Sequence, residues 1–325
     1  MAIRSHKMPK AYLKRFATAP ERGKRYGKLW VYERGKTPRI GTAHSEAAER
    51  GFFVSRAKNG SLDDFSTEAW AGKIEDDALD TLISAPSPMF VWARENRNRM
   101  ARYWALMFLR STSFYDFHKR SSDELFDVQM RRLNSDPDFR KKIVSNYAVR
   151  FGRPFTEDEI LGVIGAAVNG LLTSEQLRSQ YVGRLKLRVD LIAGVLLNKL
   201  WQIWTSPDNC EFVTCDSPVM TFRLDNWGRY SVGDGFGKEG SIVILPISPT
   251  ACLIGGVQGA QSRHVPGSDV HEINKIIISS SVRFVYSLTR SIEIEQLVQG
   301  FAGSIRPGIN AFTRSAADDS LDLFF

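Results

Sequence analysis

The hydrophobic pattern changes its period near Pro207, and this change constrains the fold more than any other feature. From about residue 65 to 205, apolar residues recur every three or four positions, as on one face of a helix. After Pro207 the chain consists of short β-type runs between Gly, Pro, Asp and Ser, and Gly27–Tyr32 is a further such run near the N-terminus. We therefore predict an α+β fold, with the central helical region packed beside a mixed or antiparallel sheet of N- and C-terminal strands.

This pattern predicts a single α+β domain over residues 1–314. Its parts are a basic arm with the first strands (1–64), the helical region (65–205) and a β-rich part (206–314), and an acidic, aromatic tail (315–325) follows. One helix is expected to begin at Ser87-Pro88, a serine cap before a first-turn proline. The last helix of the central region is expected to run from Tyr181 to Ile203, because apolar residues step by three or four along it. Capping boxes are expected at Ser121, Thr156 and Thr173.

Positive charge is concentrated at one end of the chain. The 325 residues carry a net charge of +8, yet the first 39 contain twelve Lys or Arg and two acids, a net charge of +10. The remainder is therefore slightly acidic, near −2. A concentrated basic face is typical of proteins that bind a polyanion, so we expect DNA or RNA as the partner.

The cysteine content and the hydropathy of the chain limit the cellular compartment in which we expect the protein. Three cysteines form no disulfide framework, and the first residues lack the apolar stretch of a signal peptide. The most apolar segments, around 162–172 and 191–204, are too short to span a bilayer. We therefore expect a cytoplasmic protein without a membrane partner. Cys210 and Cys215 lack a second pair, which argues against a zinc site, and Asp216 makes Cys215 a poor thiolate.

A series of short motifs extends along most of the chain. It begins with His6, Pro9, Tyr12, Leu13 and Phe16 at fixed spacing and continues with these segments: 29–32, Glu75, 110–112, 212–219, 245–249, 273–274 and 283–286. In order and spacing the series resembles the family catalogued as "domain of unknown function 4238". Here Cys215 and Ser217 stand where that family usually has Ser and Asn. The resemblance implies a fold similar to that of the family, and it assigns no reaction.

His6 and Asp216 are the candidate catalytic residues. A neutral imidazole can act as a general base, a general acid or a metal ligand near pH 7, and Asp216 lies on a turn directly after a strand. If sheet pairing brings the two together, they could share one divalent metal, Mg²⁺ or Mn²⁺, or one water molecule. The alternative is structural: His6 would anchor the N-terminal arm, and Asp216 would hydrogen-bond the backbone of its own turn.

Tyr12, Lys10, Arg15 and Arg110 are the candidate substrate-binding residues. Tyr12 and Arg110 would orient a phosphate, although Arg110 could equally cap the C-terminal end of its own helix. Further arginines precede Arg110 and alternate with aromatic residues, a mixture that suits nucleic acid but also describes a solvated helix face: Arg94, Arg97, Arg99 and Arg102 with Trp92, Tyr103 and Trp104.

The C-terminal tail ends in Leu321, Leu323, Phe324 and Phe325. It resembles the short Leu-x-Leu-Phe peptides by which DNA-processing proteins dock on replication sliding clamps, so a sliding clamp is a candidate partner. The alternative is that the tail folds back on its own core.

Three functional hypotheses follow. The first is a nucleic-acid-acting protein with metal-assisted phosphodiesterase (nuclease) activity; a role in bacterial defence against phage would fit such a family by analogy. The second is a non-enzymatic nucleic-acid or protein-binding module, in which His6 and Asp216 are structural. The third is an enzyme acting on a small anionic substrate.

Overall fold

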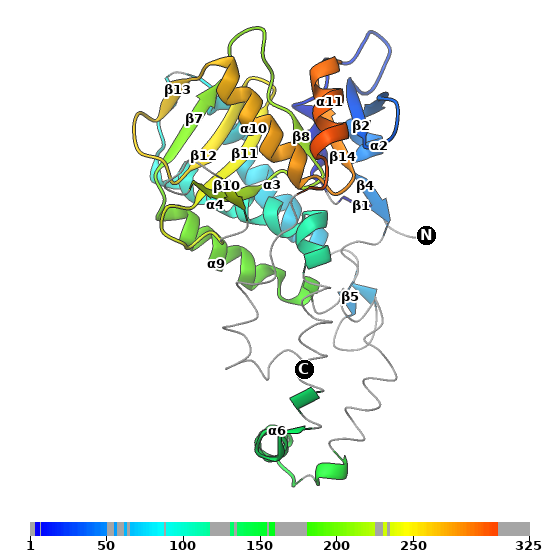
Figure 1. Ribbon diagram of the computed structural model, residues 1–325, viewed down its shortest axis with the longest axis vertical. Helices are drawn as coiled ribbons and strands as arrows, with labels where there is room; N and C mark the ends of the chain where they lie inside the picture. Colours follow the sequence, from blue (N-terminus) through cyan, green and yellow to red (C-terminus); the bar gives the residue numbers. More distant parts are fainter. Residues whose placement is uncertain are drawn as a thin grey trace. The chain divides into compact units, whose positions relative to one another are not determined.

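The structure of the protein is a computed structural model, which describes residues 4–6, 8–50, 55–56, 62–63, 66–87, 89–117, 131–132, 135–154, 156–159, 181–224, 230–232 and 235–304 (Figure 1). The chain divides into two compact units, Met1–Tyr115 with Val182–Gly308 and Asp116–Tyr181 with Ile309–Phe325. The single domain over 1–314 stays a prediction. The tail 315–325 and its four apolar residues lie outside the described residues.

Strands from both ends of the chain form one antiparallel sheet in the first unit. Its order is β3-β2-β14-β8, from β3 (Arg39–Thr42), β2 (Lys28–Glu33), β14 (Phe284–Ser287) and β8 (Thr214–Cys215). β2 and β14 pair directly, with Val285 opposite Tyr32. This arrangement confirms the predicted α+β fold with a sheet of N- and C-terminal strands.

A second sheet of the same unit is built from C-terminal strands. Its order is β10-β9-β11-β12-β7-β13, antiparallel except that β13 runs parallel to β7. The strands are β7 (Trp201–Thr205), β9 (Met220–Leu224), β10 (Tyr230–Val232), β11 (Ile242–Ser248), β12 (Ala251–Gly255) and β13 (Ser262–His264). Because β8 belongs to the first sheet and β9 to the second, residues 216–219 connect the two sheets.

The prediction of one helix from Tyr181 to Ile203 was wrong at its C-terminal end. Helix α9 covers Leu185–Leu197, and the chain then enters β7, which pairs with β12 and β13. The residues of β7 are aromatic or β-branched apart from Gln202, and the first three are buried, which suits a strand inside a sheet. The helical spacing that extended to Ile203 was therefore accidental.

Helices cover both faces of the six-stranded sheet. Helix α10 (Gly267–Ser280) shares a buried core with Cys252 and Ile254 of β12, and Figure 1 shows α10 in front of β11 and β12. On the opposite face of β12, a Cβ on Gly255 would lie 3.1 Å from the Trp104 ring of α4 (Arg94–Leu109). Side chains alternate between the faces of a strand, so this pattern places α4 and α10 on opposite sides.

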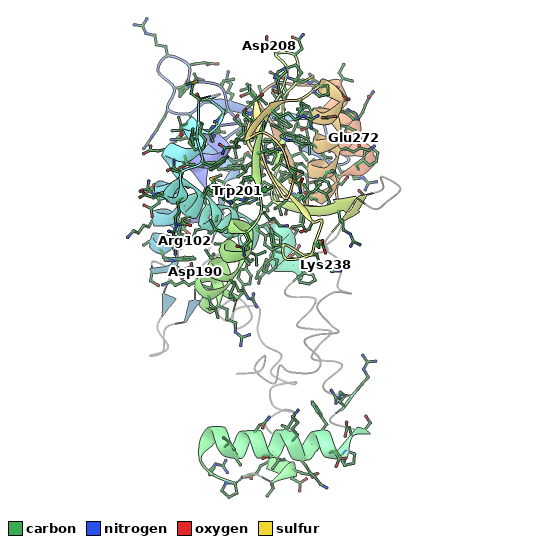
Figure 2. The ribbon with its side chains drawn as sticks, turned by 90° about the vertical axis from the view of Figure 1, so that its left-hand side faces the viewer. Arg102, Asp190, Trp201, Asp208, Lys238 and Glu272 are labelled. Atoms are coloured by element: carbon green, nitrogen blue, oxygen red, sulfur yellow. The ribbon has the colours of Figure 1, made fainter. Side chains whose placement is uncertain are left out.

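Helix α4 packs against both α3 (Ser66–Ser84) and α9. Figure 2 shows Arg102 of α4 beside Asp190 of α9, and their charged groups are 3.2 Å apart. The predicted helix start at Ser87-Pro88 was wrong, because Ser87 forms only a local turn: its hydroxyl accepts the N–H of Met89 at 3.3 Å. Residues 89–93 are not helical either, and α4 begins only at Arg94.

Some local predictions were confirmed. Thr156 and Glu159 form the expected reciprocal capping box, while Ser121 and Thr173 lie outside the described residues. The remaining elements are β1 (Arg4–His6), α1 (Lys10–Lys14), α2 (Ala43–Glu46), β4 (Ala48–Arg50), β5 (Ser55–Arg56), β6 (Leu62–Asp63), α6 (Pro137–Phe151) and α11 (Ile292–Phe301). Within the described parts of the chain, no helix combines the length and apolar character needed to cross a bilayer.

Candidate functional site

The second half of the N-terminal motif lies on α1 or directly after it, next to β11. Tyr12, Leu13 and Phe16 are completely buried. The Tyr12 hydroxyl donates to the carbonyl of Pro246 at 2.6 Å, which leaves its oxygen to accept from the Thr214 hydroxyl at 2.7 Å. Burial raises the pKa of Tyr12 well above its ordinary value. Tyr12, predicted to orient a substrate phosphate, is therefore committed to contacts within the protein.

A bulge in β11 explains why side chains of the α1 segment reach its backbone. Strand β9 pairs only with residues Ile242–Ile244 of β11, and the register with β12 shifts between Pro246 and Ser248. Arg15, which follows α1, donates from its Nε to the carbonyl of Ile247. Bulges leave backbone groups outside the regular ladder, and here Tyr12 and Arg15 hydrogen-bond them.

Arg110 lies at the C-terminal end of α4 and is 1% exposed. Its guanidinium forms an ion pair with Glu75 of α3, and a second one with Glu68 of the same helix at 3.8 Å. The side chains of Glu75 and Glu68 are 18% and 28% exposed, so the two carboxylates reach the surface while the Arg110 guanidinium lies beneath it. The sequence left open a phosphate-binding and a helix-capping role for Arg110, and the structure shows its charge balanced by α3.

Tyr103 adds a phenol to the same face of α4, two helical turns before Arg110. Burial raises its pKa well above the ordinary value, and the nearby Glu75 carboxylate raises it further, while Arg110 and Arg15 act in the opposite direction. We use the name Arg110 cluster for this set of six residues: Tyr12, Arg15, Glu68, Glu75, Tyr103 and Arg110. Sequence reasoning noted Tyr103 only as an aromatic neighbour of arginines, although its seven-residue spacing from Arg110 already places both on one helix face.

The Asp216 carboxylate holds the start of β14. It accepts the backbone N–H groups of Val282 and Arg283 at 2.8 Å each, and that of Phe284 at 3.2 Å. A carboxylate with several backbone donors is a typical structural anchor. The structural alternative for Asp216 anticipated a local turn, whereas the backbone it binds lies 66–68 residues further along the chain.

The motif segment 110–112 docks on the segment that contains Asp216. The backbone N–H of Ser113 donates to the Ser217 hydroxyl at 3.1 Å, and that of Thr112 approaches the Asp216 carbonyl at 3.5 Å. On the other side, Ser280 of α10 donates to the Ser217 carbonyl at 3.1 Å. Motifs that are far apart in the sequence therefore meet around the turn between the two sheets.

The pairing of His6 with Asp216 stays a prediction. His6 ends β1, whose backbone pairs with β4 so that His6 lies opposite Ala48, but its side chain lies outside the described residues. Among the residues that the structure describes, no group of three or more His, Cys, Asp or Glu side chains could hold a metal ion. A Mg²⁺ or Mn²⁺ site with His6 and Asp216 as ligands is likewise untested.

The buried cysteines are not reactive thiolates. Burial raises the pKa of the Cys215 and Cys252 thiols far above the usual range, and the Asp216 charge contributes further for Cys215. This agrees with the sequence-based interpretation of Cys215 as a poor thiolate.

An exposed basic loop follows α1, and hydrogen bonds between Thr18 and Lys28 join its two ends. The N–H of Thr18 donates to the carbonyl of Lys28 at 2.8 Å, and the N–H of Lys28 donates to the Thr18 hydroxyl at 3.0 Å. A Cβ on Gly27 would lie 1.7 Å from the Thr18 carbonyl oxygen, so only glycine permits this closure. We call residues Lys10–Lys28, which comprise α1 and this loop, the basic segment.

The basic segment contains seven cations and one acid, Glu21. Lys28 pairs with Glu21 at 2.5 Å. No other ion pair of the described residues involves a cation of this segment, which leaves six without a carboxylate partner: Lys10, Lys14, Arg15, Arg22, Lys24 and Arg25. Of these, Lys14, Arg22, Lys24 and Arg25 are exposed.

Tyr26 is the aromatic residue at the base of this loop. Its ring stacks on His44 of α2, with centroids 4.8 Å apart and planes inclined by 2°. Lys10 Nζ lies 4.7 Å and Arg25 Cζ 5.5 Å from the centre of the same ring. Cations are thus gathered around a partly buried aromatic pair.

Three of the four arginines of α4 have partners inside the protein, and the fourth, Arg94, is exposed. Arg97 donates to the carbonyls of Leu197 and Lys199, both at 2.9 Å, and so caps the end of α9. Arg99 pairs with Glu95 of its own helix. Together with the Arg102–Asp190 pair, these contacts favour the structural interpretation of the Arg and aromatic mixture in α4.

A family model described as "Protein of unknown function (DUF4238)" matches residues 4–291. No curated protein and no solved structure matches the chain.

Proposed function

The chain belongs to the DUF4238 family, whose description assigns no reaction, and we propose that it acts on nucleic acid by binding the phosphate backbone through the basic segment. The observation that carries this proposal is the excess of cations without carboxylate partners among the described residues of Lys10–Lys28. Cations that are already paired gain less from a phosphate, whereas unpaired ones release counterions from nucleic acid when they bind it.

The stacked pair of Tyr26 and His44 supports the same proposal. Proteins that bind single strands combine a positive surface with aromatic side chains on which bases stack. Here both features occur within a few ångströms, since Lys10 and Arg25 lie against the Tyr26 ring. Single-stranded DNA or RNA is therefore the expected ligand.

Metal-assisted phosphodiester cleavage in bacterial defence is the enzymatic form of the proposal, with His6 and Asp216 as its residues. Asp216 would have to bind a metal while it also accepts three backbone N–H groups. A binding module without catalysis needs no such second role for Asp216, so the geometry supports binding better than cleavage.

A sliding clamp as a further partner, through Leu321, Leu323, Phe324 and Phe325, remains a prediction, as does a small anionic substrate.

The test is the salt dependence of binding to labelled single-stranded and duplex DNA and RNA. In the variant Arg22→Gln/Lys24→Gln/Arg25→Gln we expect weaker binding to every sequence and a salt slope reduced by about 2, because each lost phosphate contact on a single strand removes about 0.7 from it. The matched control removes three exposed cations elsewhere, Lys73→Gln/Lys141→Gln/Lys142→Gln, and should bind like the wild type. Equal losses in both variants would contradict the proposal.

The same ligands, incubated with Mg²⁺ or Mn²⁺, test cleavage. Cleavage that disappears in His6→Ala and in Asp216→Asn, with both variants still folded by circular dichroism, would establish the enzymatic form. Salt-sensitive binding without cleavage would establish a binding module. Absence of any binding at low salt would refute the nucleic-acid proposal.

A further inference from the structure

Apolar side chains gather on the surface in front of α4 and at the turn after α9. Met89 is 87% exposed, Val91 68% and Leu200 58%. Phe90 and Trp92 alternate with the first two and are partly buried. Single exposed apolar residues are ordinary on a protein surface, whereas several that adjoin one another mark an interaction site. We call these five residues the Met89 patch.

Aromatic contacts join the two parts of the Met89 patch. The rings of Phe90 and Trp92 meet edge-to-face with centroids 4.9 Å apart, and Trp92 meets Trp201, the residue after Leu200, in the same way at 5.0 Å. Trp201 is buried, and the Arg97 guanidinium lies over its ring. The exposed side chains of the patch therefore stand on a fixed base, and a partner can bind them without first ordering that base.

The charges that follow the Met89 patch are of both signs. Arg94 and Glu95 are the first two residues of α4. Arg94 is exposed and pairs with no carboxylate of the described residues, while Glu95 pairs with Arg99 of its own helix and remains largely exposed. Adjacent helical residues point about 100° apart and do not face each other, so Arg94 and Glu95 cannot pair within one helix.

A second copy of this chain complements both features. A two-fold interface is self-complementary, so the apolar patch of one copy would meet the same patch of the other, and Arg94 of each copy would meet Glu95 of the other. An apolar centre with a charged rim is the usual anatomy of a protein interface. Nucleic acid fits this surface less well, because its phosphates would repel Glu95.

We propose that the Met89 patch is the centre of an isologous homodimer interface, in which Arg94 and Glu95 of the two copies pair across the two-fold axis. This proposal does not depend on nucleic-acid binding. Dimerisation would give one assembly two basic segments, and a strand long enough to reach both would bind more tightly than a short one.

Sedimentation equilibrium of the full chain over a range of concentrations tests the proposal. We expect the wild type to pass from the 36.6 kDa monomer to a species of twice that mass. Met89→Glu/Val91→Glu should raise the dissociation constant by about 30-fold or more, the loss expected for a hot-spot residue. The matched control, Leu187→Glu/Leu191→Glu, changes two exposed leucines of α9 and should leave the dimer intact.

Exchanged charges give a readout that general destabilisation does not move. Arg94→Glu alone and Glu95→Arg alone each place like charges across the axis, and each should weaken the dimer by about tenfold. The double variant Arg94→Glu/Glu95→Arg should regain the dimer, because the axis pairs the exchanged charges again. Circular dichroism and the melting temperature establish that each variant is folded.

The proposal is wrong if the wild type has a single monomeric mass at every concentration. Co-sedimentation of that monomer with phosphatidylglycerol and phosphatidylethanolamine vesicles, lost in Met89→Glu/Val91→Glu, would then assign the patch to a lipid surface. A dimer that survives this variant but not the α9 control would place the interface on α9. A double charge variant no better than the single ones would exclude the two-fold pairing of Arg94 with Glu95.

Discussion

Cationic and aromatic side chains are mixed in two stretches of this chain, helix α4 and the basic segment. In α4 and at its C-terminal end most arginines are engaged: Arg97 caps α9, and Arg110, which follows the helix, is balanced by the carboxylates of α3. In the basic segment, most cations have no carboxylate partner in the described structure, and two of them lie against Tyr26. The difference shows that composition alone does not identify a polyanion-binding surface; what matters is whether each cation already has a partner.

The largest effect expected from this comparison is that of Arg110→Gln. The substitution takes the Arg110 guanidinium away from Glu75 and Glu68 in a mostly buried setting, and breaking a buried ion pair in this way typically costs about 3–5 kcal/mol. The free energy of unfolding from urea denaturation measures it. The control is Arg99→Gln, which breaks the exposed pair with Glu95 and should cost at most about 0.5 kcal/mol. Similar values for both variants would show that Arg110 is no more structural than a surface arginine.

Arg97→Gln should have an intermediate effect. The substitution removes charged donors from the carbonyls of Leu197 and Lys199, and hydrogen bonds of this kind contribute about 1.5–3 kcal/mol. It also removes the cation 5.1 Å from the centre of the Trp201 ring. Hydrogen exchange at residues 197–201, together with the free energy of unfolding, reports both losses. Unchanged protection there would mean that Arg97 does not hold the end of α9, which would weaken the contrast between the two stretches.

Gly27→Ala should have the smallest effect on stability, about 1 kcal/mol or less, because the basic loop is exposed and contributes little to the core. The added Cβ would meet the Thr18 carbonyl oxygen at 1.7 Å, so the base of the loop must open. We expect faster trypsin cleavage between Arg22 and Lys28 and weaker nucleic-acid binding. Gly72→Ala in α3 is the control, since nothing lies within 4 Å of its added Cβ, and a helical alanine should be neutral or stabilising. Equal trypsin sensitivity of the two variants would contradict a closed loop.

Features governed by neighbours in the sequence could be predicted well. The Thr156 capping box and the strand near residue 30 depend on a few adjacent residues, and both were confirmed. The α+β class followed from where the hydrophobic period changes. The family was identified from motifs whose order needs no knowledge of contacts, and its match over residues 4–291 confirms it.

Features governed by distant partners could not be predicted. The strand β7 continues a helical spacing, and only its pairing with β12 and β13 shows that it is extended. For Asp216 the sequence left open a catalytic or metal-binding role and a local turn, whereas in the structure its carboxylate accepts backbone N–H groups at the start of β14. The Tyr103 hydroxyl has no hydrogen-bond partner among the described residues, and this depends on several elements of the fold, which no local pattern can reveal.

Helix α1 has one face turned inward and one turned to solvent, and this division has a consequence for how the chain can vary. Tyr12 and Leu13 are fully buried, whereas Lys14 is exposed to solvent and Lys10 is partly buried between the two faces. Charge on the outer face can therefore be added or lost without opening the sheet beneath it. Substitutions at Lys14 should therefore change the charge of this surface while Tyr12 and Leu13 keep the architecture unchanged.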